Sequence, residues 1–257
     1  MIFETHAHYD DEMFNEDRDE LLSGMAEAGI GRIVNIAADL ESVKSSIALA
    51  DRYPFIYAAA GVHPSDAGQL NEENFQWLRE QVKHPRVVAV GEIGLDYYWE
   101  KDQEARANQQ YWFRRQLNLA REEKLPVVIH SREAAKDTRD IAKEERLEEI
   151  GGVVHCFSYS VEMAREYLNM GMYLGIGGVL TYKNARVLKE VVDYVPMDRI
   201  VLETDSPYLT PVPNRGKRNS SLNLPYVVAA IAEIKGITPE EVMDITWKNG
   251  CQLYRLD

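Results

Sequence analysis

The order of apolar and polar positions divides the chain into two alternating kinds of segment. In the longer segments, apolar residues recur every three or four positions, as at Phe113, Leu117 and Ala120, which is typical of a helix with one buried face. Alternation of strands with such helices favours parallel strands joined by right-handed connections. The shorter segments are rich in β-branched residues and predict strands at Ile2–His6, Arg32–Ala37, Phe55–Val62, Val87–Glu92, Pro126–His130, Gly152–Phe157, Met172–Gly175 and Arg199–Asp205.

Eight such units in 257 residues favour a closed α/β barrel of the TIM, or (β/α)8, type. Periodicity does not show whether a sheet closes, so an open doubly wound sheet stays as the alternative. No linker, repeat or low-complexity segment divides the chain, and we expect a single domain over residues 1–257. A last helix is predicted to begin at Thr238, where Pro239 and Glu241 complete an N-terminal capping box.

Composition narrows the functional classes. The net charge of -13 argues against a protein that coats nucleic acid, because affinity for phosphates is largely electrostatic. It is compatible with brief binding of DNA at one locally positive site, to which bound divalent metals would contribute charge. The chain has no apolar run of membrane-spanning length and no signal-peptide pattern at its start, and its 2 cysteines are too few for a disulfide framework. We therefore expect a cytoplasmic protein with no membrane partner, and a monomer or weak oligomer.

Chemically active side chains recur at the C-terminal ends of the predicted strands. Glu92 and Asp205 each end a strand, and Glu203 shares a strand face with Asp205. Functional groups of an α/β barrel gather at this end, because every βα loop opens there. Five of the 6 histidines also lie at or just beyond a strand end, namely His6, His8, His63, His130 and His155.

Each of these residues also has a purely structural interpretation. A single histidine on a strand is more often hydrogen-bonded structure than a ligand, and a carboxylate at a strand end can cap the next helix. These interpretations do not explain why imidazoles and carboxylates gather at one end of the barrel. Imidazole and carboxylate groups together suit Zn, Mn or a similar divalent ion, and a carboxylate can bridge two ions. His84 precedes a strand and is predicted to lie on the surface.

Taken in order, six segments resemble the TatD family of metal-dependent deoxyribonucleases, within the amidohydrolase-like barrels. The resemblance runs essentially from end to end and is specific as a set. One departure follows Arg218-Asn219, where the family often has an acidic residue and a proline and this chain has Ser220-Ser221. The matching segments are Glu4-Thr5-His6-Ala7-His8, Gly61-Val62-His63-Pro64, Gly91-Glu92-Ile93-Gly94-Leu95-Asp96, Ile129-His130-Ser131-Arg132, His155-Cys156-Phe157-Ser158 and Glu203-Thr204-Asp205-Ser206-Pro207-Tyr208-Leu209.

The resemblance implies two divalent metal ions per chain, which could be Mg, Mn or Zn. Glu92 would bridge them, and the remaining ligands would be His6, His8 and Asp205 for one ion and His130 and His155 for the other. His63 would contact phosphate or support a ligand, with a structural role equally open, and Glu203 would orient a ligand. The implied catalytic residues are Glu92 and Asp205, the latter accepting or relaying the proton of a metal-activated water that cleaves a phosphodiester bond.

The substrate implied by the resemblance is DNA, cut from single-stranded ends in the 3′ to 5′ direction. Arg132, Lys183, Arg215, Lys217 and Arg218 follow the fifth, seventh and eighth predicted strands, so they are predicted to lie at the active end, where Arg132, Lys217 and Arg218 in particular would hold phosphates. Solvated surface is the alternative for each. The run Tyr97-Tyr98-Trp99 could stack on bases or pack beneath its loop.

Three other functions remain open from the sequence. A small-molecule amidohydrolase would use the same kind of barrel, although many of these carry a bridging lysine where this chain has Glu92. A D-aminoacyl-tRNA deacylase would use the same metal site. A barrel that binds without catalysis is disfavoured, because no expected ligand is missing.

Overall fold

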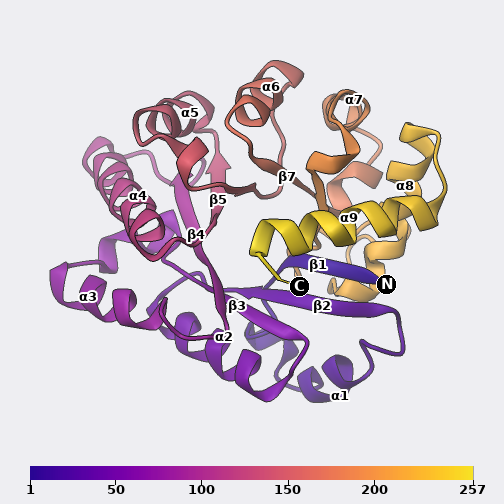
Figure 1. Cartoon of the computed structure of the whole chain (residues 1–257), viewed down its shortest axis with the longest axis horizontal. Helices are drawn as coiled ribbons and strands as arrows, with labels where there is room; N and C mark the ends of the chain where they lie inside the picture. The colour runs from indigo at the N-terminus through magenta and orange to yellow at the C-terminus, as the bar shows by residue number, and fades with distance from the viewer. Residues whose placement is uncertain (257) are drawn as a thin grey trace.

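The computed structural model, which describes residues 1–256, contains one sheet of parallel strands surrounded by helices (Figure 1). The sheet has 8 strands, and each pairs with its neighbour in chain order. This confirms the predicted α/β barrel. The strands are β1 (Ile2–Ala7), β2 (Ile30–Ile36), β3 (Ile56–Ala60), β4 (Val87–Asp96), β5 (Val127–Arg132), β6 (Gly152–Val154), β7 (Tyr173–Ile176) and β8 (Ile200–Leu202).

The helices follow the strands and form the outer layer. On α4, the predicted apolar stripe of Phe113, Leu117 and Ala120 is buried, as its spacing indicates. The capping box at Thr238 is also confirmed. The Thr238 hydroxyl accepts from the backbone N–H of Glu241, and the Glu241 carboxylate accepts from the backbone N–H of Thr238. The helices are α1 (Arg18–Ser23), α2 (Leu40–Arg52), α3 (Glu72–Gln81), α4 (Gln103–Glu123), α5 (Ala135–Glu144), α6 (Val161–Asn169), α7 (Arg186–Tyr194), α8 (Leu224–Lys235) and α9 (Pro239–Tyr254).

The barrel closes where β1 meets the segment that follows β8. Ala7 and Ser206 form an isolated parallel bridge. The backbone N–H of Asp205 donates to the carbonyl of His6 at 3.0 Å, and the N–H of His8 donates to the carbonyl of Ser206 at 2.8 Å. The seam of the barrel therefore runs through residues that the sequence assigns to the metal site.

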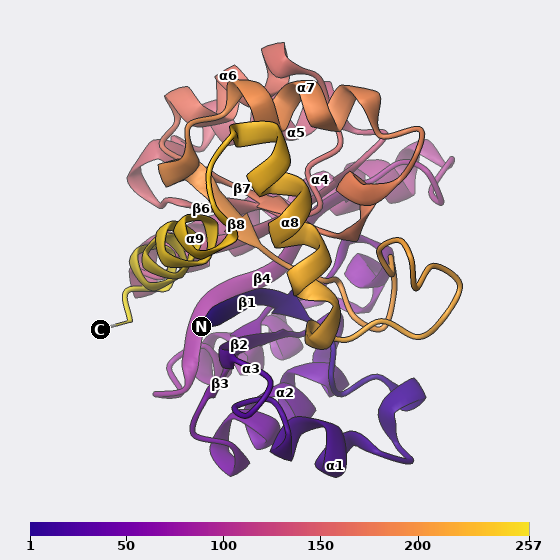
Figure 2. The same ribbon diagram turned by 90° about the vertical axis from the view of Figure 1, so that its right-hand side faces the viewer.

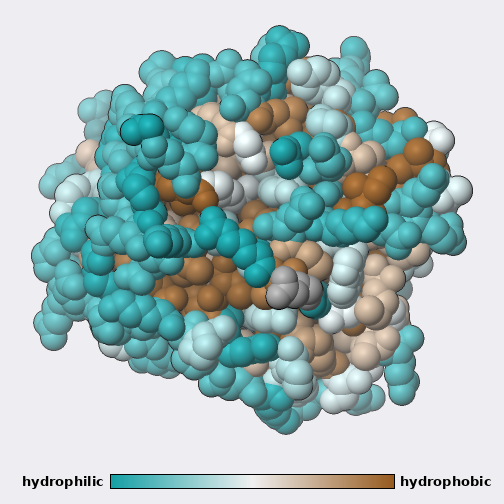
Figure 3. Space-filling model, in the orientation of Figure 1, coloured by the Kyte–Doolittle hydropathy of each residue, from teal (hydrophilic) through white to brown (hydrophobic). Residues whose placement is uncertain are grey.

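Helix α9 covers the N-terminal mouth of the barrel and lies beside β1 (Figure 1). Gly250 of α9 packs directly on the ring of Phe3, and the hydroxyl of Tyr254 donates to the carbonyl of Thr5. On this face, apolar side chains gather beside the end of the chain within a hydrophilic surround (Figure 3). Every strand contributes to one buried cluster that also contains Leu253 and Tyr254, so the cluster fills the barrel interior next to this mouth: Phe3, Val34, Ile36, Ala59, Val88, Ala89, Val128, Val153, Tyr173 and Val201.

Three strands end three or more residues away from the predicted position. Strand β4 continues four residues beyond Glu92 to Asp96, because it pairs with β5 as far as Arg132. Strands β6 and β8 end at Val154 and Leu202, before the predicted ends. The prediction that Glu203 and Asp205 share one strand face is therefore wrong. The backbone of Asp205 is left-handed, with φ 57°, and turns its side chain away from the direction that a strand would impose.

Within residues 1–256, no helix is both long enough and apolar enough to cross a membrane.

Candidate metal centre

The C-terminal mouth of the barrel holds the predicted metal ligands in one groove. In Figure 2 the chain ends lie on one side of the barrel, and the loop after β8 projects on the other. A groove of about 850 Å³ opens at this mouth, and His6 lies fully buried beneath it. The strand ends contribute the titratable lining residues His8, His63, Glu92, Asp96, His130, His155 and Asp205.

One donor group joins the end of β1 to β4 and to the segment after β8. The Nε2 atoms of His6 and His8 lie 3.1 Å apart. Asp205 Oδ1 lies 3.5 Å from the first and 3.3 Å from the second. Glu92 Oε2 lies 3.4 and 3.7 Å from the same two nitrogens. A tetrahedral ion with bonds of about 2.0–2.1 Å separates its ligand atoms by about 3.3–3.4 Å, so the spacing of this group fits a divalent cation.

A second donor group uses the other oxygen of Glu92. Glu92 Oε1 lies 2.8 Å from His155 Nε2 and 2.9 Å from His130 Nδ1, and these nitrogens are 3.2 Å apart. His63 Nε2 lies farther away, at 3.7 Å from the same oxygen. One buried carboxylate thus turns an oxygen toward each of two histidine pairs.

The remaining ring nitrogens determine how three of the histidines can act. His8 Nδ1 lies 2.8 Å from the carbonyl of Ile36 and donates to it, which leaves Nε2 free to bind a metal. His130 places Nε2 3.2 Å from Asp96 Oδ2, so its Nδ1 is the ligand atom. His63 Nδ1 accepts from the backbone N–H of Ser65, so in the neutral ring Nε2 carries the proton and donates. His63 is therefore suited to contact an anion rather than a metal.

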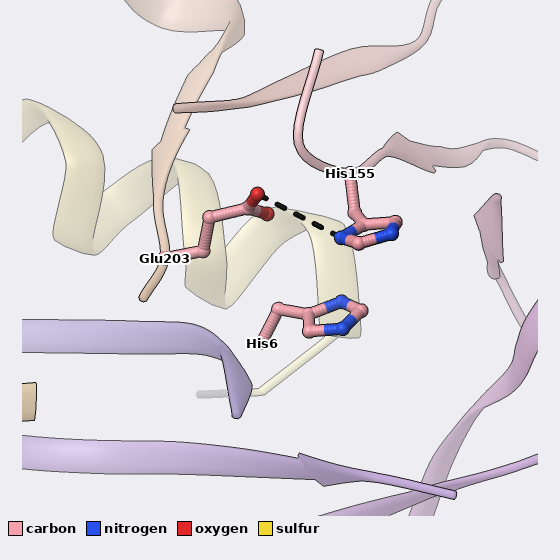
Figure 4. Close-up of side chains that lie close together, drawn as sticks. All are labelled: His6, His155 and Glu203. Atoms are coloured by element: carbon pink, nitrogen blue, oxygen red, sulfur yellow. Dashed lines mark ion pairs between the residues drawn. The ribbon is translucent and has the colours of Figure 1, made fainter. Parts of the chain in front are cut away.

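His6 and His155 turn their second nitrogens toward one buried carboxylate. Their rings stack with centroids 3.9 Å apart, and Glu203 lies beside both (Figure 4). His155 Nδ1 lies 3.8 Å from Glu203 Oε1, and neither Nδ1 has a hydrogen-bond partner among the described residues. The glycine at 175 makes room for this carboxylate, because a Cβ there would lie 2.0 Å from Glu203 Oε2.

The electrostatics of the site keep the shared carboxylate of Glu92 charged. Burial raises the pKa of Glu92, but the surrounding histidines outweigh it and hold that pKa well below its usual range. Burial lowers the pKa of His8 and His155, but the neighbouring carboxylates outweigh it and raise the two values to about 9 and about 10. Two imidazolium groups thus balance buried carboxylates, and a bound cation would take over this role when those rings lose their protons.

The sequence as a whole matches one protein family. The family model described as TatD related DNase matches residues 3–255. The chain belongs to the TatD family. The donor groups described above are carried by the segments in which the sequence resembles that family.

Relatives within the TatD family match over nearly the whole chain. The Bacillus subtilis protein named uncharacterized metal-dependent hydrolase YabD is 44% identical over 257 residues, which is 100% of both chains. The Cronobacter sakazakii protein named 3′-5′ ssDNA/RNA exonuclease TatD is 34% identical over 98% of this chain and 97% of its own. The crystal structure of the TatD homologue YjjV from Escherichia coli superposes with a TM-score of 0.93 at 31% identity, covering 100% of this chain and 98% of that one. The chain is therefore a metal-dependent hydrolase of the TatD family.

The basic residues predicted to hold phosphates have separate positions in this TatD-family barrel. Arg132 lines the groove, whereas Lys217 and Arg218 do not. Both terminal nitrogens of Arg218 bind the carboxylate of Asp17, and its guanidinium lies over Phe14. The structure corrects the prediction for Arg218, because its charge is already paired and ties the loop after β8 to the start of α1.

The aromatic run after β4 is divided between core and surface. Tyr97 is buried and its hydroxyl donates to Asp137. Tyr98 and Trp99 are exposed, and Trp99 lines the groove with 70% of its surface accessible. The packing interpretation is correct for Tyr97, and the stacking interpretation stays a prediction for Trp99.

Asp96 is a site residue to which the sequence assigned no role. It is buried, and one of its oxygens lies 3.2 Å from His130 Nε2. The signal that could have found it is its position in the same segment, four residues after Glu92, if the predicted strand had been extended that far. Four more residues of strand would have placed Asp96 on the same face as Glu92, at the same end of the barrel.

Glu203→Gln is expected to weaken metal binding about 10- to 100-fold while the barrel stays folded, because a carboxylate that orients ligand histidines also strengthens them as ligands. The measurement is competition with a chromogenic chelator, with circular dichroism as the check on folding. Glu233→Gln, on the exposed part of α8, is the control and should bind metal normally. Unchanged affinity in Glu203→Gln would show that the carboxylate does not orient His6 or His155.

Proposed function

We propose that this chain is a two-metal phosphodiesterase that removes nucleotides from the ends of single-stranded DNA. The observation that carries the proposal is the buried carboxylate of Glu92, with one oxygen facing His6 and His8 and the other facing His130 and His155. An arrangement of this kind suits two ions that share one ligand and act on the same phosphate. The name of the Cronobacter sakazakii relative, an exonuclease on single-stranded DNA and RNA, supports the choice of substrate.

Bound divalent ions would lower the pKa of a water and neutralise charge on the phosphate. The residues of the chain would supply the remaining functions. Asp205 is held ionised. Burial raises its pKa, but the hydrogen bond from His8 and the charges of the histidines outweigh burial and bring that pKa below its usual range. Its Oδ1 faces the histidines, which leaves the second oxygen to accept the proton of the attacking water. His63 Nε2–H would donate to a phosphate oxygen in the groove.

The depth of the site supports a single-stranded end as the substrate. Glu92 is only 3% exposed and His6 is fully buried, so the scissile phosphate must descend into the groove. A duplex is too wide and stiff to follow it, and flipping a base out of a duplex costs a few kcal/mol. A free end can enter without that cost, and an internal phosphate of a closed strand would have to bring two flanking chains into the same groove.

Linear single-stranded DNA is therefore expected to be hydrolysed at least about tenfold faster than the covalently closed circle of the same sequence, given the cost of admitting an internal segment. The assay follows release of mononucleotides by metal-loaded protein. Ligated and unligated portions of one oligonucleotide supply the matched substrates. Equal rates on the two would contradict cleavage from ends. Hydrolysis of an aminoacyl ester or a small ester, with none of either DNA, would overturn the proposed phosphodiesterase activity.

A further inference from the structure

The groove has one aromatic and basic lip, formed by Tyr98 and Trp99 after β4 and by Arg132 at the end of β5. The guanidinium of Arg132 lies 3.9 Å from the ring centroid of Tyr98 and 5.8 Å from that of Trp99. The two aromatic rings meet edge to face, with centroids 4.7 Å apart. Arg132 therefore covers one face of Tyr98, and Trp99, which lines the groove, keeps most of its surface exposed.

Asp96 connects this lip to the metal centre. Its Oδ1 accepts from the backbone N–H groups of Tyr98 and Trp99, at 2.9 and 3.1 Å. Its Oδ2 lies 3.2 Å from Nε2 of His130. A single buried carboxylate thus orients a candidate metal ligand and, through the other oxygen, the start of the aromatic lip. The position of Trp99 is consequently tied to the second donor group.

Arg132 is placed to hold a phosphate next to the one that is cleaved. It lies two residues after His130 on β5, so the two side chains share a face and their Cα atoms are about 6.6 Å apart. Among the described residues that line the groove it is the only arginine or lysine. Within residues 1–256, no carboxylate pairs with its guanidinium, in contrast to that of Arg218.

The opposite lip of the groove is negatively charged. Strand β1 lies across the barrel from β5, and Asp10, Asp11 and Asp39 line the groove on the side of β1 and β2. Carboxylates there repel phosphates, so an anionic strand that enters the groove is directed toward Arg132. The groove is thus asymmetric in charge and in stacking surface.

We propose that Trp99 and Arg132 form a subsite for the nucleotide adjacent to the scissile phosphate. The base stacks on the open face of Trp99, and the phosphate of that nucleotide pairs with Arg132, which Tyr98 holds in place by a cation–π contact. This inference rests on the proposed function, because it assigns one nucleotide of the single-stranded substrate to a place beside the metal centre. It assigns Trp99 a contact with the base that does not depend on base identity.

The test compares Trp99→Ala, Trp99→Phe and Arg132→Ala on two oligodeoxynucleotides, one of which lacks the base of the nucleotide adjacent to the terminal phosphodiester. For Trp99→Ala we expect KM on the complete oligonucleotide to rise about 5- to 150-fold, as for loss of one stacked base, with little change on the abasic one. Trp99→Phe should recover part of the loss. Tyr226→Ala, which removes an exposed aromatic side chain on α8, is the control and should match the parent.

Arg132→Ala should raise KM on both oligonucleotides and reduce the slope of log K against log salt by about 0.7, the value for one phosphate of a single strand. Tyr226→Ala, the control, should keep the parent's salt slope and the parent's rate on bis(p-nitrophenyl) phosphate. An equal loss for Trp99→Ala on complete and abasic oligonucleotides would overturn the stacking subsite. An unchanged salt slope for Arg132→Ala would overturn the phosphate contact.

A binding measurement separates this inference from the proposed reaction. The dissociation constants of both fluorescent oligonucleotides are measured by anisotropy in chelator, where metal-dependent hydrolysis is stopped. Weaker binding of the complete oligonucleotide by Trp99→Ala, with equal binding of the abasic one, supports the subsite even if the metal-loaded parent cleaves neither. Equal binding of both oligonucleotides by the parent and by Trp99→Ala would overturn it.

Discussion

Glu92→Gln is expected to reduce phosphodiester hydrolysis by at least about a hundredfold, the size of effect seen when a key electrostatic group is removed from an active site. The substitution keeps the shape of the side chain but removes its negative charge. Both donor groups depend on that charge, because Oε2 faces His6 and His8 and Oε1 lies within 2.9 Å of His130 and His155. Metal content should fall together with activity.

The measurements are the metal-to-protein ratio after dialysis and the rate on bis(p-nitrophenyl) phosphate. Glu27→Gln is the matched control, because Glu27 is exposed and lies far from the groove in the loop after α1. It should retain the parent's metal content and rate. A Glu92→Gln protein that hydrolyses the substrate normally after removal of its metal would contradict the assignment of Glu92 as a shared metal ligand.

Gly94→Ala is expected to lower the free energy of unfolding by more than about 3 kcal/mol, in the range reached when a side chain is forced into a conformation open only to glycine and against packed backbone. Gly94 lies in β4 opposite His130 of β5, with φ 143°. A Cβ at this position would lie 1.9 Å from the carbonyl oxygen of His130. The two strands must move apart, and His130 must move with its strand.

For a chain of this length, that loss corresponds to a Tm lower by at least about 6 °C, and it should be accompanied by weaker metal binding. Differential scanning calorimetry of the metal-free proteins measures the first effect, and chelator competition measures the second. Gly68→Ala is the matched control, since nothing lies within 4 Å of a Cβ at that site. A Gly94→Ala protein as stable as Gly68→Ala would show that the close approach of β4 to β5 is not needed for the fold.

The sequence determined the architecture and the neighbourhood of the site because both depend on local patterns. Apolar runs separated by helical stripes predict parallel strands and outer helices whatever the distant residues are. In such a barrel, all strands point the same way, so residues that end different strands must meet at one mouth. This is why His6, Glu92 and His130 could be predicted as neighbours although they are far apart along the chain.

The assignment of roles to the second nitrogens of the histidines needed the tertiary structure. Which nitrogen of His8 or His130 faces the site follows from Ile36 and Asp96, residues on other strands whose contacts no local pattern predicts. The backbone turn at Asp205 likewise follows from the seam with β1, where its N–H donates to His6. An alternating strand pattern continued through this turn and placed Glu203 and Asp205 on one face, which the fold does not allow.

The basic residues show the same difference between what the sequence predicts and what the tertiary structure decides. Their number and their place after strands are visible in the sequence, and these alone made Arg132 and Arg218 equal candidates for a phosphate contact. The fold distinguishes them: Asp17, 201 residues away, pairs with Arg218, whereas within residues 1–256 no carboxylate pairs with Arg132, whose guanidinium lies over the rings of Tyr98 and Trp99. Residue type and strand order thus determined which chemistry the protein carries, and only contacts between distant segments decided which side chains are free to perform it, because a charge is available to a ligand only where the folded chain leaves it unpaired.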